Sequence, residues 1–402
     1  MKKHILLLDE NPKSLQLLQE TYEQSDCALE LLTSQSASDA FSKIEQHPVE
    51  VLMVDMTRPS EQVQQFINQT ADGKPQLPRL LITDLSDQRA LIKWVGKANQ
   101  FLIKPCDPIT IKAALERRAV IRNWFPSDAV VNLLVKVQKL PSPPGLYYEI
   151  IRKLNGHASL EDIGNLIGKD PSLTSKILQL VNSTAFALQN PISSAVEAVL
   201  FLGVETTKSL VLLTQSFTSF LGTPAVLFSV DKLWQHALRT ATYCQTIAKS
   251  QGVEEREIEE IYTAGLLHDL GKLVLAANFS QQFRDANMMA KAKKMPLWEA
   301  EQEIFKTNHA EIGACLLAIW GLETSLVESL AFHHQPTRSH VRTFGSLLAV
   351  HAGNAIANAV INQSIEVDVD WQYINGCGMG DKISQWLSEC SELPPIGNLR
   401  FN

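Results

Sequence analysis

The first 122 residues contain five short apolar runs, and each run is followed by a segment of helix length. The apolar runs span residues 4–9, 28–33, 49–55, 79–83 and 100–104. The helix-length segments lie near residues 12–24, 36–46, 60–71, 87–97 and 108–124. Apolar runs of this length that alternate with helices predict an α/β fold with a doubly wound, five-stranded parallel sheet.

Side chains suited to phosphoryl chemistry end four of these runs. They are Asp9 and Glu10 after the first run, Asp55 at the third, Thr83 at the fourth and Lys104 at the fifth. In a doubly wound sheet the functional site lies at the carboxyl ends of the strands, so these residues are expected to converge. Three carboxylates at one edge repel each other unless a cation such as Mg²⁺ lies among them. In the alternative interpretation, the carboxylates only cap helices.

This pattern resembles the receiver domain of response regulators. The resemblance implies that Asp55 is the phosphoacceptor and that a sensor histidine kinase is the phosphoryl donor. It also implies Mg²⁺ binding by Asp9, Glu10 and Asp55, with a backbone carbonyl near Thr57, and switch roles for Thr83, Phe101 and Lys104. The Lys104–Pro105 peptide bond is expected to be cis. The stretch after Asp55, MTRPSEQ, keeps Pro59 but lacks the Asp-Gly that commonly follows, so the loop shape is expected to differ.

Charge and composition exclude several classes of function. The net charge is −7, and residues 1–122 contribute −1 of it, so neither part has the basic surface of a nucleic-acid-binding protein. No apolar run approaches the roughly 18 residues of a membrane span, and Asp9 ends the N-terminal run too early for a signal peptide. The six cysteines lack a CxxC motif, which favours reduced thiols and a cytoplasmic location.

The remaining residues, 123–402, are expected to form a second domain, in which residues 145–220 have the pattern of a series of helices. We divide it into a helical part at about 128–225, a histidine-bearing part at about 226–360 and a closing segment at 361–402. Residues 159–183 superficially suggest a DNA-binding helix-turn-helix. Their second helix has one Lys and no Arg, and it carries an apolar stripe formed by Leu173, Ile177, Leu178 and Val181. This stripe favours a core helix, so we expect no nucleic-acid partner.

An adjacent histidine and aspartate, His268 and Asp269, interrupt the apolar stretch AGLLHDLGKLVLA. We expect one helix over 257–277, in which the small residues Ala264, Gly265 and Gly271 clear space beside the imidazole. An imidazole next to a carboxylate suits a transition-metal site, because an unpaired charge is costly to bury. Five further histidines in helical segments are candidate partners: His236, His309, His333, His334 and His351.

Residues 128–390 resemble the HDOD family, a signalling branch of the HD superfamily of metal-dependent phosphohydrolases. The resemblance rests on blocks such as LPSPPGLYYEIIRKL, LHDLGKLVL and AEIGACLLAIWGL. It implies that the second domain is entirely helical. It also implies metal ligation by His236, His268 and Asp269, a second metal on His309, His333 and His334, and a phosphate contact from Lys272. Iron, manganese or zinc would be the metal. Asn354 stands where the HD pattern closes with an aspartate, and no Gly-Tyr-Pro follows the histidine pair, which disfavours hydrolysis of cyclic-di-GMP.

Three interpretations of this domain remain open from the sequence. It could be a non-catalytic module that binds an unidentified downstream protein, a metal-dependent phosphohydrolase, or a domain whose histidines are core residues without metal. Lys272 could equally face solvent at a helix end. The preferred hypothesis is a cytoplasmic response regulator in which phosphorylation of Asp55 controls protein interactions of the output domain. A receiver-regulated phosphohydrolase is the alternative, and a homodimer is compatible with either.

The closing segment carries six apolar side chains that are expected to pack back on the helical core. They are Trp371, Tyr373, Ile374, Ile383, Trp386 and Leu387. Cys377 and Cys390 have no partner motif and are expected to be free, buried thiols.

Overall fold

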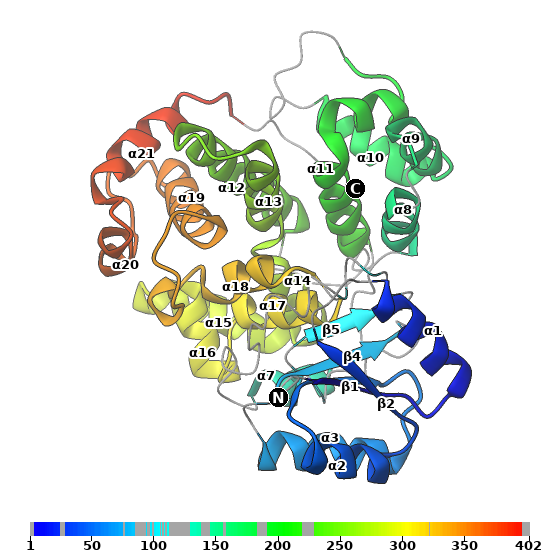
Figure 1. Ribbon diagram of the computed structural model, residues 1–402. Coiled ribbons are helices and arrows are strands. Elements are labelled where there is room, and N and C mark those ends of the chain that lie inside the picture. The colour runs from blue at the N-terminus through cyan, green and yellow to red at the C-terminus, as the bar shows by residue number, and fades with distance from the viewer. Residues whose placement is uncertain are drawn as a thin grey trace. The chain divides into compact units, whose positions relative to one another are not determined.

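The structure is a computed structural model (Figure 1). It describes residues 4–24, 29–74, 77–84, 100–104, 129–137, 145–155, 158–182, 191–218, 229–320 and 322–395, together with positions 94, 97, 98, 106, 108 and 111. The chain forms two compact units, one of residues 1–136 with 315–324 and one of 137–314 with 325–395 and the chain end. None of the described helices is long and apolar enough to cross a membrane.

The N-terminal unit contains the expected parallel sheet, which confirms the predicted fold class. Its strands are β1 (His4–Leu8), β2 (Glu30–Ser34), β3 (Val49–Asp55), β4 (Arg79–Thr83) and β5 (Gln100–Ile103). They lie in the order β2-β1-β3-β4-β5, and every neighbouring pair is parallel. This order places the carboxyl ends of β1 and β3 side by side in the middle of the sheet.

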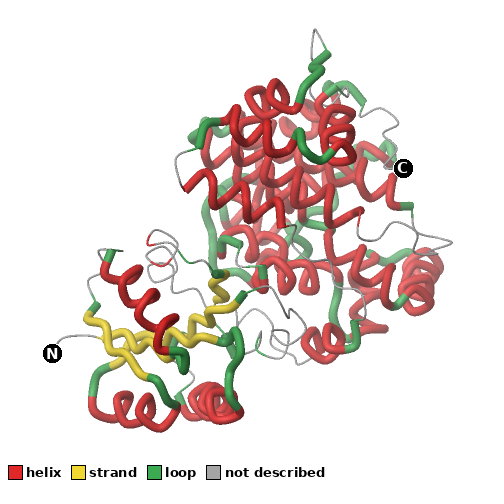
Figure 2. Tube along the Cα trace, turned by 90° about the vertical axis from the view of Figure 1, so that its right-hand side faces the viewer, coloured by secondary structure: helices red, strands yellow, loops and turns green. Residues whose placement is uncertain are grey.

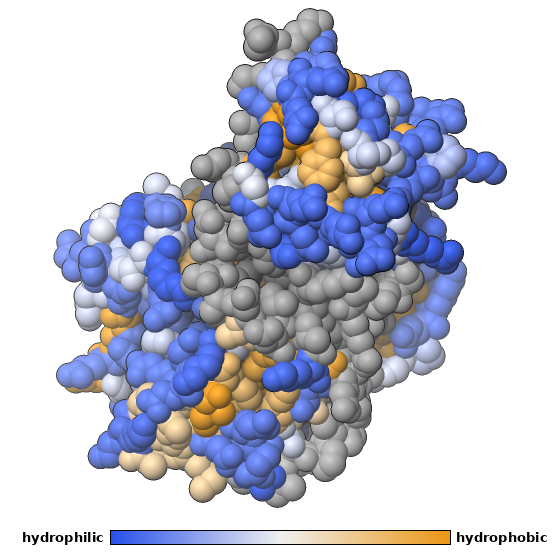
Figure 3. All heavy atoms as spheres, turned by 90° about the horizontal axis from the view of Figure 1, so that it is seen from below, coloured by the Kyte–Doolittle hydropathy of each residue, from blue (hydrophilic) through white to orange (hydrophobic). Residues whose placement is uncertain are grey.

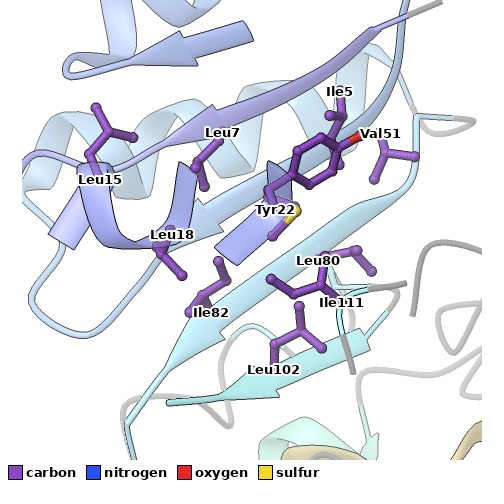
Figure 4. Packing of buried hydrophobic residues seen from close by; sticks show 11 residues of the cluster. Ile5, Leu7, Leu15, Leu18, Tyr22, Val51, Leu80, Ile82, Leu102 and Ile111 are labelled. Carbon is purple, nitrogen blue, oxygen red and sulfur yellow. The ribbon is translucent and has the colours of Figure 1, made fainter. Parts of the chain in front are cut away.

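Three helices of this unit begin at side-chain caps. Asn11 caps α1 (Pro12–Glu23), Ser36 caps α2 (Ala37–Gln46) and Ser60 caps α3 (Glu61–Gly73), each by accepting hydrogen bonds from backbone N–H groups. The apolar face of α1 packs on the sheet through Leu15, Leu18 and Tyr22, which meet strand residues such as Ile5 and Leu7 (Figure 4). The predicted helices at 87–97 and 108–124 lie mostly outside the described residues, and so does Pro105.

The other described elements are helical, as the sequence predicted (Figure 2). The first group comprises α7 (Ala129–Val135), α8 (Gly145–Asn155), α9 (Leu160–Ile167), α10 (Pro171–Val181) and α11 (Ala195–Thr218). In α10, the suspected recognition helix, Leu173, Ile177 and Val181 are buried, whereas Leu178 is only half-buried. An apolar face committed to the core in this way matches the core interpretation of the stripe.

The histidine-bearing part is a bundle of helices. Its members are α12 (Val230–Ser250), α13 (Glu255–Leu267), α14 (Leu270–Asn278), α15 (Ser280–Lys293), α16 (Leu297–Phe305), α17 (His309–Ile319), α18 (Thr324–Phe332) and α19 (Ser346–Ile361). The helices α12, α13 and α19 pack against one another and form its centre. The prediction of one helix over 257–277 is wrong, because the helix is interrupted at His268 and Asp269, between α13 and α14.

The closing segment forms α20 (Trp371–Gly376) and α21 (Ile383–Ser391). Four of its six apolar side chains are buried, namely Tyr373, Ile374, Ile383 and Trp386. Leu387 is half-buried, and Trp371 is 49% exposed, so the expectation for Trp371 was wrong. Cys390 is free and buried, whereas Cys377 is free and only half-buried. Exposed apolar residues of this kind are ordinary on protein surfaces, and the face in Figure 3 shows apolar patches among mostly hydrophilic residues.

Candidate phosphoacceptor site and candidate metal centre

The sheet brings Asp9, Asp55 and Lys104 together at the carboxyl ends of β1, β3 and β5. Asp9 and Asp55 are buried, with exposed fractions of 4% and 9%. The Lys104 ammonium forms an ion pair with Asp55 Oδ2 and donates a hydrogen bond of 2.7 Å to Ser14 Oγ. The backbone N–H of Thr57 donates to Asp55 Oδ1 at 2.8 Å. Asp55 is therefore held by one cation and one backbone donor at the strand end.

Asp9 has one satisfied and one unsatisfied carboxylate oxygen. Its Oδ1 accepts a hydrogen bond of 2.8 Å from the backbone N–H of Asn11, whereas the buried Oδ2 has no hydrogen-bond partner. Burial, with a further contribution from the neighbouring Asp55, raises the pKa of Asp9, although Ser14, Asn11 and Lys104 act in the opposite direction. An unpartnered oxygen next to a second carboxylate is a donor set that suits Mg²⁺.

The other predicted receiver residues lie around this group without joining the ion pair. Glu10 is exposed, and its carboxylate accepts hydrogen bonds from the Ser60 N–H at 2.9 Å and the Ser60 hydroxyl at 2.7 Å. Thr83 is buried and donates its hydroxyl to the carbonyl of Asp84 at 2.7 Å. Phe101 is fully buried. The bond between Glu10 and the cap of α3 was not foreseen, since Ser60 lies 50 residues away along the chain.

In the helical unit, the break at His268 and Asp269 turns both side chains toward the same point. His268 Nδ1 lies 2.7 Å from the carbonyl oxygen of Gly265, so a proton on Nδ1 leaves Nε2 free to accept or to ligate. This Nε2 lies 3.3 Å from Asp269 Oδ2. The carbonyl of Gly265, which a continuous helix would bond to a backbone N–H, is thus taken by a side chain.

The small residues near His268 admit neighbouring backbone and do not clear space over the imidazole. A Cβ on Gly265 would lie 2.9 Å from Cα of Ala241 in α12. A Cβ on Gly271 would clash with the backbone carbonyl of His309 and would lie 2.8 Å from the N–H of Gly313 in α17. The glycines therefore let α12 and α17 approach the break closely, which brings His236 and His309 to Asp269.

The first cluster consists of His236, His268 and Asp269, whose ligand atoms lie within 4.8 Å of one another. His236 comes from α12, and its Nε2 lies 3.5 Å from Asp269 Oδ2. The rings of His236 and His268 meet edge to face at 5.2 Å between centroids. We refer to these three residues as triad A.

The second cluster, triad B, consists of His309, His333 and His334, also within 4.8 Å of one another. His309 begins α17, and the histidine pair follows α18. His334 Nε2 lies 2.9 Å from His309 Nε2, which in turn lies 3.1 Å from Asp269 Oδ1. The two oxygens of Asp269 thus face different triads, a geometry that lets one carboxylate serve two metal ions.

Outer contacts orient the histidines of triad B. His333 Nδ1 lies 2.7 Å from the carbonyl of Leu330, which leaves its Nε2 for the cluster. His351 links the carbonyl of His333 at 2.7 Å to the backbone N–H of Asp370 at 2.8 Å. His309 is held by the buried carboxylate of Glu301. No feature of the sequence distinguishes Glu301 from Glu299 and Glu303, which occupy alternate positions of the same helix.

Burial sets the protonation states of the two triads. Burial lowers the pKa of His236 to about 3 and holds the pKa values of His333 and His334 well below their usual range. Burial raises the pKa of Asp269, but His268 and Lys272 outweigh this effect and keep it well below its usual range. Burial lowers the pKa of His309, but Glu301 outweighs it and the net direction is upward. Neutral imidazoles at His236, His333 and His334 beside an ionised Asp269 are the states that metal ligation requires, whereas the surroundings of His309 favour its charged form.

Three buried atoms in the triads have no hydrogen-bond partner: His268 Nε2, His333 Nε2 and Asp269 Oδ1. Buried polar atoms normally have a partner, and a cation would satisfy unpartnered nitrogens and oxygens that face one another. Imidazole nitrogens with one carboxylate suit iron, manganese or zinc. The residues present therefore fit a transition metal.

The two remaining predicted residues lie at the edge of triad A. Lys272 is not simply a solvent-facing residue at a helix end, because its ammonium forms an ion pair with Asp269 Oδ2 at 2.6 Å. Asn354 in α19 places Oδ1 3.0 Å from His236 Nε2 and also accepts a hydrogen bond of 3.2 Å from Asn358. The uncharged Asn354, which the sequence resemblance assigns to the closing aspartate position of the HD pattern, thus lies next to His236.

Triad B opens into a cavity of about 730 Å³. Polar and charged residues predominate in its lining, among them Lys272, Lys294, Trp298, Asn358 and Asp368. A cavity of this size accommodates a small-molecule ligand. The metal-ligand candidates thus share the lining with two lysines and four carboxylates, so groups of both charges surround the cavity.

Comparisons with known proteins agree with both halves of this description. Residues 5–116 match the response regulator receiver domain, and residues 140–336 match the HDOD domain. An uncharacterized protein of Treponema pallidum is 29% identical over 204 residues, which are 50% of this chain and 38% of that relative. The chain thus spans well under half the length of that curated relative.

Two solved structures share the helical fold. One is an HDOD domain protein of unknown function from Geobacter sulfurreducens, with 22% identity, a TM-score of 0.51, and coverage of 67% of this chain and 98% of that one. The other, named "Putative phosphohydrolase", is from Shewanella amazonensis, with 23% identity, a TM-score of 0.50, and coverage of 67% and 99%. At these identities the likeness shows the fold alone.

The sheet with its acidic edge and the helical bundle with its histidines define a two-domain chain, a receiver followed by an HD-related domain. The chain belongs to the response regulators that carry an HDOD domain, with the receiver at residues 5–116 and the HDOD domain at 140–336.

Proposed function

We propose that a sensor histidine kinase phosphorylates this response regulator at Asp55 and that the modified receiver changes how the HDOD domain engages a downstream protein. The ion pair between Lys104 and the buried Asp55 is the observation that supports this proposal most directly. A carboxylate at a strand end, held by a lysine and next to Asp9, is positioned to accept a phosphoryl group.

In the proposed reaction, a carboxylate oxygen of Asp55 attacks phosphorus, and the bond to the donor nitrogen or oxygen breaks. The Lys104 ammonium then pairs with the acyl phosphate, and the backbone N–H of Thr57 remains available to an oxygen of the product. Bound Mg²⁺ would supply compensation for the negative charge of the phosphoryl oxygens. Asp9, with its unpartnered oxygen, would hold that ion together with Asp55.

Incubation with acetyl phosphate and Mg²⁺ tests the phosphoacceptor. Intact-mass spectrometry should find one added phosphoryl group on the wild-type chain and none on Asp55→Ala. The matched control is Asp72→Ala, which removes an exposed carboxylate from α3 and should be labelled like the wild type. Equal labelling of Asp55→Ala would refute the assignment.

We propose that the output is protein binding without catalysis, and Asn354 supports this preference. A neutral amide is a weaker metal ligand than the carboxylate of the HD pattern, and Asn354 already engages His236 through Oδ1. Affinity capture with phosphorylated wild type and with Asp55→Ala should recover different sets of partners. Identical sets from both forms would contradict control of the output by Asp55.

A metal-dependent phosphohydrolase is the second candidate, and the shared position of Asp269 between the two triads favours it. A metal bound there would supply Lewis-acid activation of a phosphoester. In this function Lys272 would turn from Asp269 to a phosphate oxygen, and the cavity beside triad B would hold the rest of the ligand. The HDOD-like structure named "Putative phosphohydrolase" is consistent with this chemistry.

Hydrolysis of bis(p-nitrophenyl) phosphate by protein loaded with Mn²⁺ or Fe²⁺ separates the two candidates. Turnover that is lost in His268→Ala would establish the enzyme. Metal binding without turnover on this and on natural phosphoesters would favour the interaction module.

A further inference from the structure

Helix α16 carries a fully buried carboxylate outside the predicted metal-ligand set. Glu301 has an exposed fraction of 0%, and its Oε2 lies 2.6 Å from His309 Nδ1 and accepts a hydrogen bond of 2.8 Å from the His309 backbone N–H. Its other oxygen, Oε1, is buried without a hydrogen-bond partner. Glu301 is held in the interior by contacts to a single residue, although a buried carboxylate is costly.

These two contacts fix the imidazole of His309 in orientation and in proton position. A carboxylate acceptor at Nδ1 holds the ring proton there, so the lone pair of Nε2 is directed the other way. That nitrogen lies 3.1 Å from Asp269 Oδ1 and 2.9 Å from His334 Nε2. The bond to the backbone N–H ties the same carboxylate to the start of α17.

The same helix contacts a second histidine of triad B. Trp298 lies one turn before Glu301 and stacks on His334, with ring centroids 5.8 Å apart and an angle of 17° between the planes. Residues three apart lie on one face of a helix, so Trp298 and Glu301 both face triad B. Triad A is oriented by residues of other elements: Gly265 contacts His268, and Asn354 contacts His236.

We infer that α16 is the positioning element of triad B: Glu301 sets the tautomer and orientation of His309, and Trp298 restrains His334. This inference rests on the proposed metal binding and does not depend on catalysis. Outer carboxylates that orient ligating histidines typically contribute 10- to 100-fold to metal affinity. The effect is expected at triad B, while triad A keeps its own supports.

The experiment compares Glu301→Gln and Glu301→Ala with Glu303→Gln in the full-length chain. Glu303 is an exposed glutamate of the same helix that pairs with Lys293, so the control makes the same chemical change away from the site. Mn²⁺ titrations by calorimetry should show two sites in the wild type and in Glu303→Gln. Glu301→Gln, which keeps an oxygen acceptor, should weaken one site about 10-fold, and Glu301→Ala about 100-fold.

Imidazole ¹⁵N spectra of the metal-free proteins give an independent readout. The wild type should carry the His309 proton on Nδ1, and Glu301→Ala should shift His309 toward the Nε2-protonated tautomer. Unchanged Mn²⁺ affinity and an unchanged tautomer in folded Glu301→Ala would overturn the inference. A wild-type chain that binds no Mn²⁺ would contradict the proposed metal function, and the spectra alone would then decide the role of Glu301.

Trp298 provides the second arm of the test. Trp298→Phe keeps an aromatic face against His334 and should retain most of the affinity, whereas Trp298→Ala should weaken the same site that Glu301→Ala weakens. Weakening of the other site by Trp298→Ala would overturn the assignment of α16 to triad B.

Discussion

The two candidate sites of this chain are assembled in different ways. The phosphoacceptor site lies at the carboxyl ends of neighbouring parallel strands, so the sheet itself brings Asp9 and Asp55 together. The metal centre takes its residues from the interior of α12, from the α13–α14 break and from the ends of other helices. Backbone hydrogen bonding therefore determines the first site, whereas helix packing determines the second.

The same difference is visible in how burial acts on charge. Burial raises the pKa of Asp9, where a second carboxylate is the neighbour. At Asp269 the neighbouring His268 and Lys272 outweigh burial and lower the pKa. At the receiver edge Lys104 pairs with Asp55, and Asp9 keeps a buried oxygen without a hydrogen-bond partner, whereas Asp269 lies among cationic and polarisable groups.

The largest effect is expected at Asp269. Because its two oxygens face different triads, Asp269→Ala should abolish metal binding at both, whereas His236→Ala should weaken triad A alone. Plasma mass spectrometry of metal per chain measures this directly. Asp285→Ala, which removes an exposed carboxylate on α15, is the control and should keep the wild-type content. Retention of one metal by Asp269→Ala would contradict the shared position.

The second largest effect concerns the close packing of α14 against α17 at the candidate metal centre. Gly271→Ala places a methyl group against the backbone carbonyl of His309, so α14 and α17 must separate. We expect a loss of about 3 kcal/mol in the free energy of unfolding of the helical domain, together with weaker metal binding at triad B. Urea unfolding followed by circular dichroism measures the loss.

Gly73→Ala is the matched control for Gly271→Ala. A Cβ on Gly73 would have no neighbour within 4 Å, and the residue lies at the end of α3. This substitution should leave the stability unchanged or raise it by about 0.5 kcal/mol. A similar result for both glycines would show that the approach of α14 to α17 is not tight.

The sequence predicted the receiver part well, because strand ends can be located from apolar runs without knowledge of packing. The runs at 49–55 and 79–83 coincide with β3 and β4. The contacts between helices could not be predicted from apolar runs. The break at His268 was missed because the side-chain bond to Gly265 is invisible to periodicity, and Glu301 was missed because three glutamates at alternate positions look alike.

The resemblance to the HDOD family supplied what the periodicity of the helices could not. It grouped His236 with His268 across 32 residues and His309 with the pair His333 and His334, and the structure brings these residues into the two triads. Their roles as ligands remain a prediction. In the closing segment neither periodicity nor the resemblance predicted burial correctly. Trp371 and Tyr373 are both aromatic and lie two residues apart, but only Tyr373 is buried in the core.

A pH dependence follows from the buried histidines of the metal-free helical domain. Burial keeps His236 neutral in the folded state, with a pKa of about 3, whereas the unfolded chain takes up a proton near pH 6.5. Stability is therefore fully present above pH 6.5 and is lost as the pH falls from 6.5 toward 3, by up to about 1.4 kcal/mol per pH unit for such a histidine. His333 and His334 act in the same direction, and His309 acts in the opposite one.

Urea unfolding at pH 6.5, 6.0 and 5.5 with a metal chelator measures this slope. We expect a decrease of about 2 kcal/mol between pH 6.5 and 5.5, and a shallower decrease in His236→Gln. Stability that is constant over this range would contradict burial of neutral imidazoles in the helical domain.

The smallest expected effect is a change in the free energy of unfolding, and it has opposite signs for substitutions of Asp9 and Asp269. Because the pKa of Asp9 is raised, the stability linked to this group is present below about pH 3.8, its ordinary value, and is lost as the pH rises through the folded-state pKa. At pH 7 Asp9→Asn removes a destabilising charge and keeps an oxygen that can accept from the Asn11 N–H, so the metal-free receiver should gain about 1 kcal/mol. The gain should disappear near pH 4.

Asp269→Asn should destabilise the helical domain at pH 7, because the pKa of Asp269 is lowered and Lys272 loses its partner. Unfolding of both variants in chelator measures the two signs. Stabilisation by both substitutions would show that burial alone governs these carboxylates, and the contrast between Asp9, which has no ion pair of its own, and Asp269, which pairs with Lys272, would then be wrong.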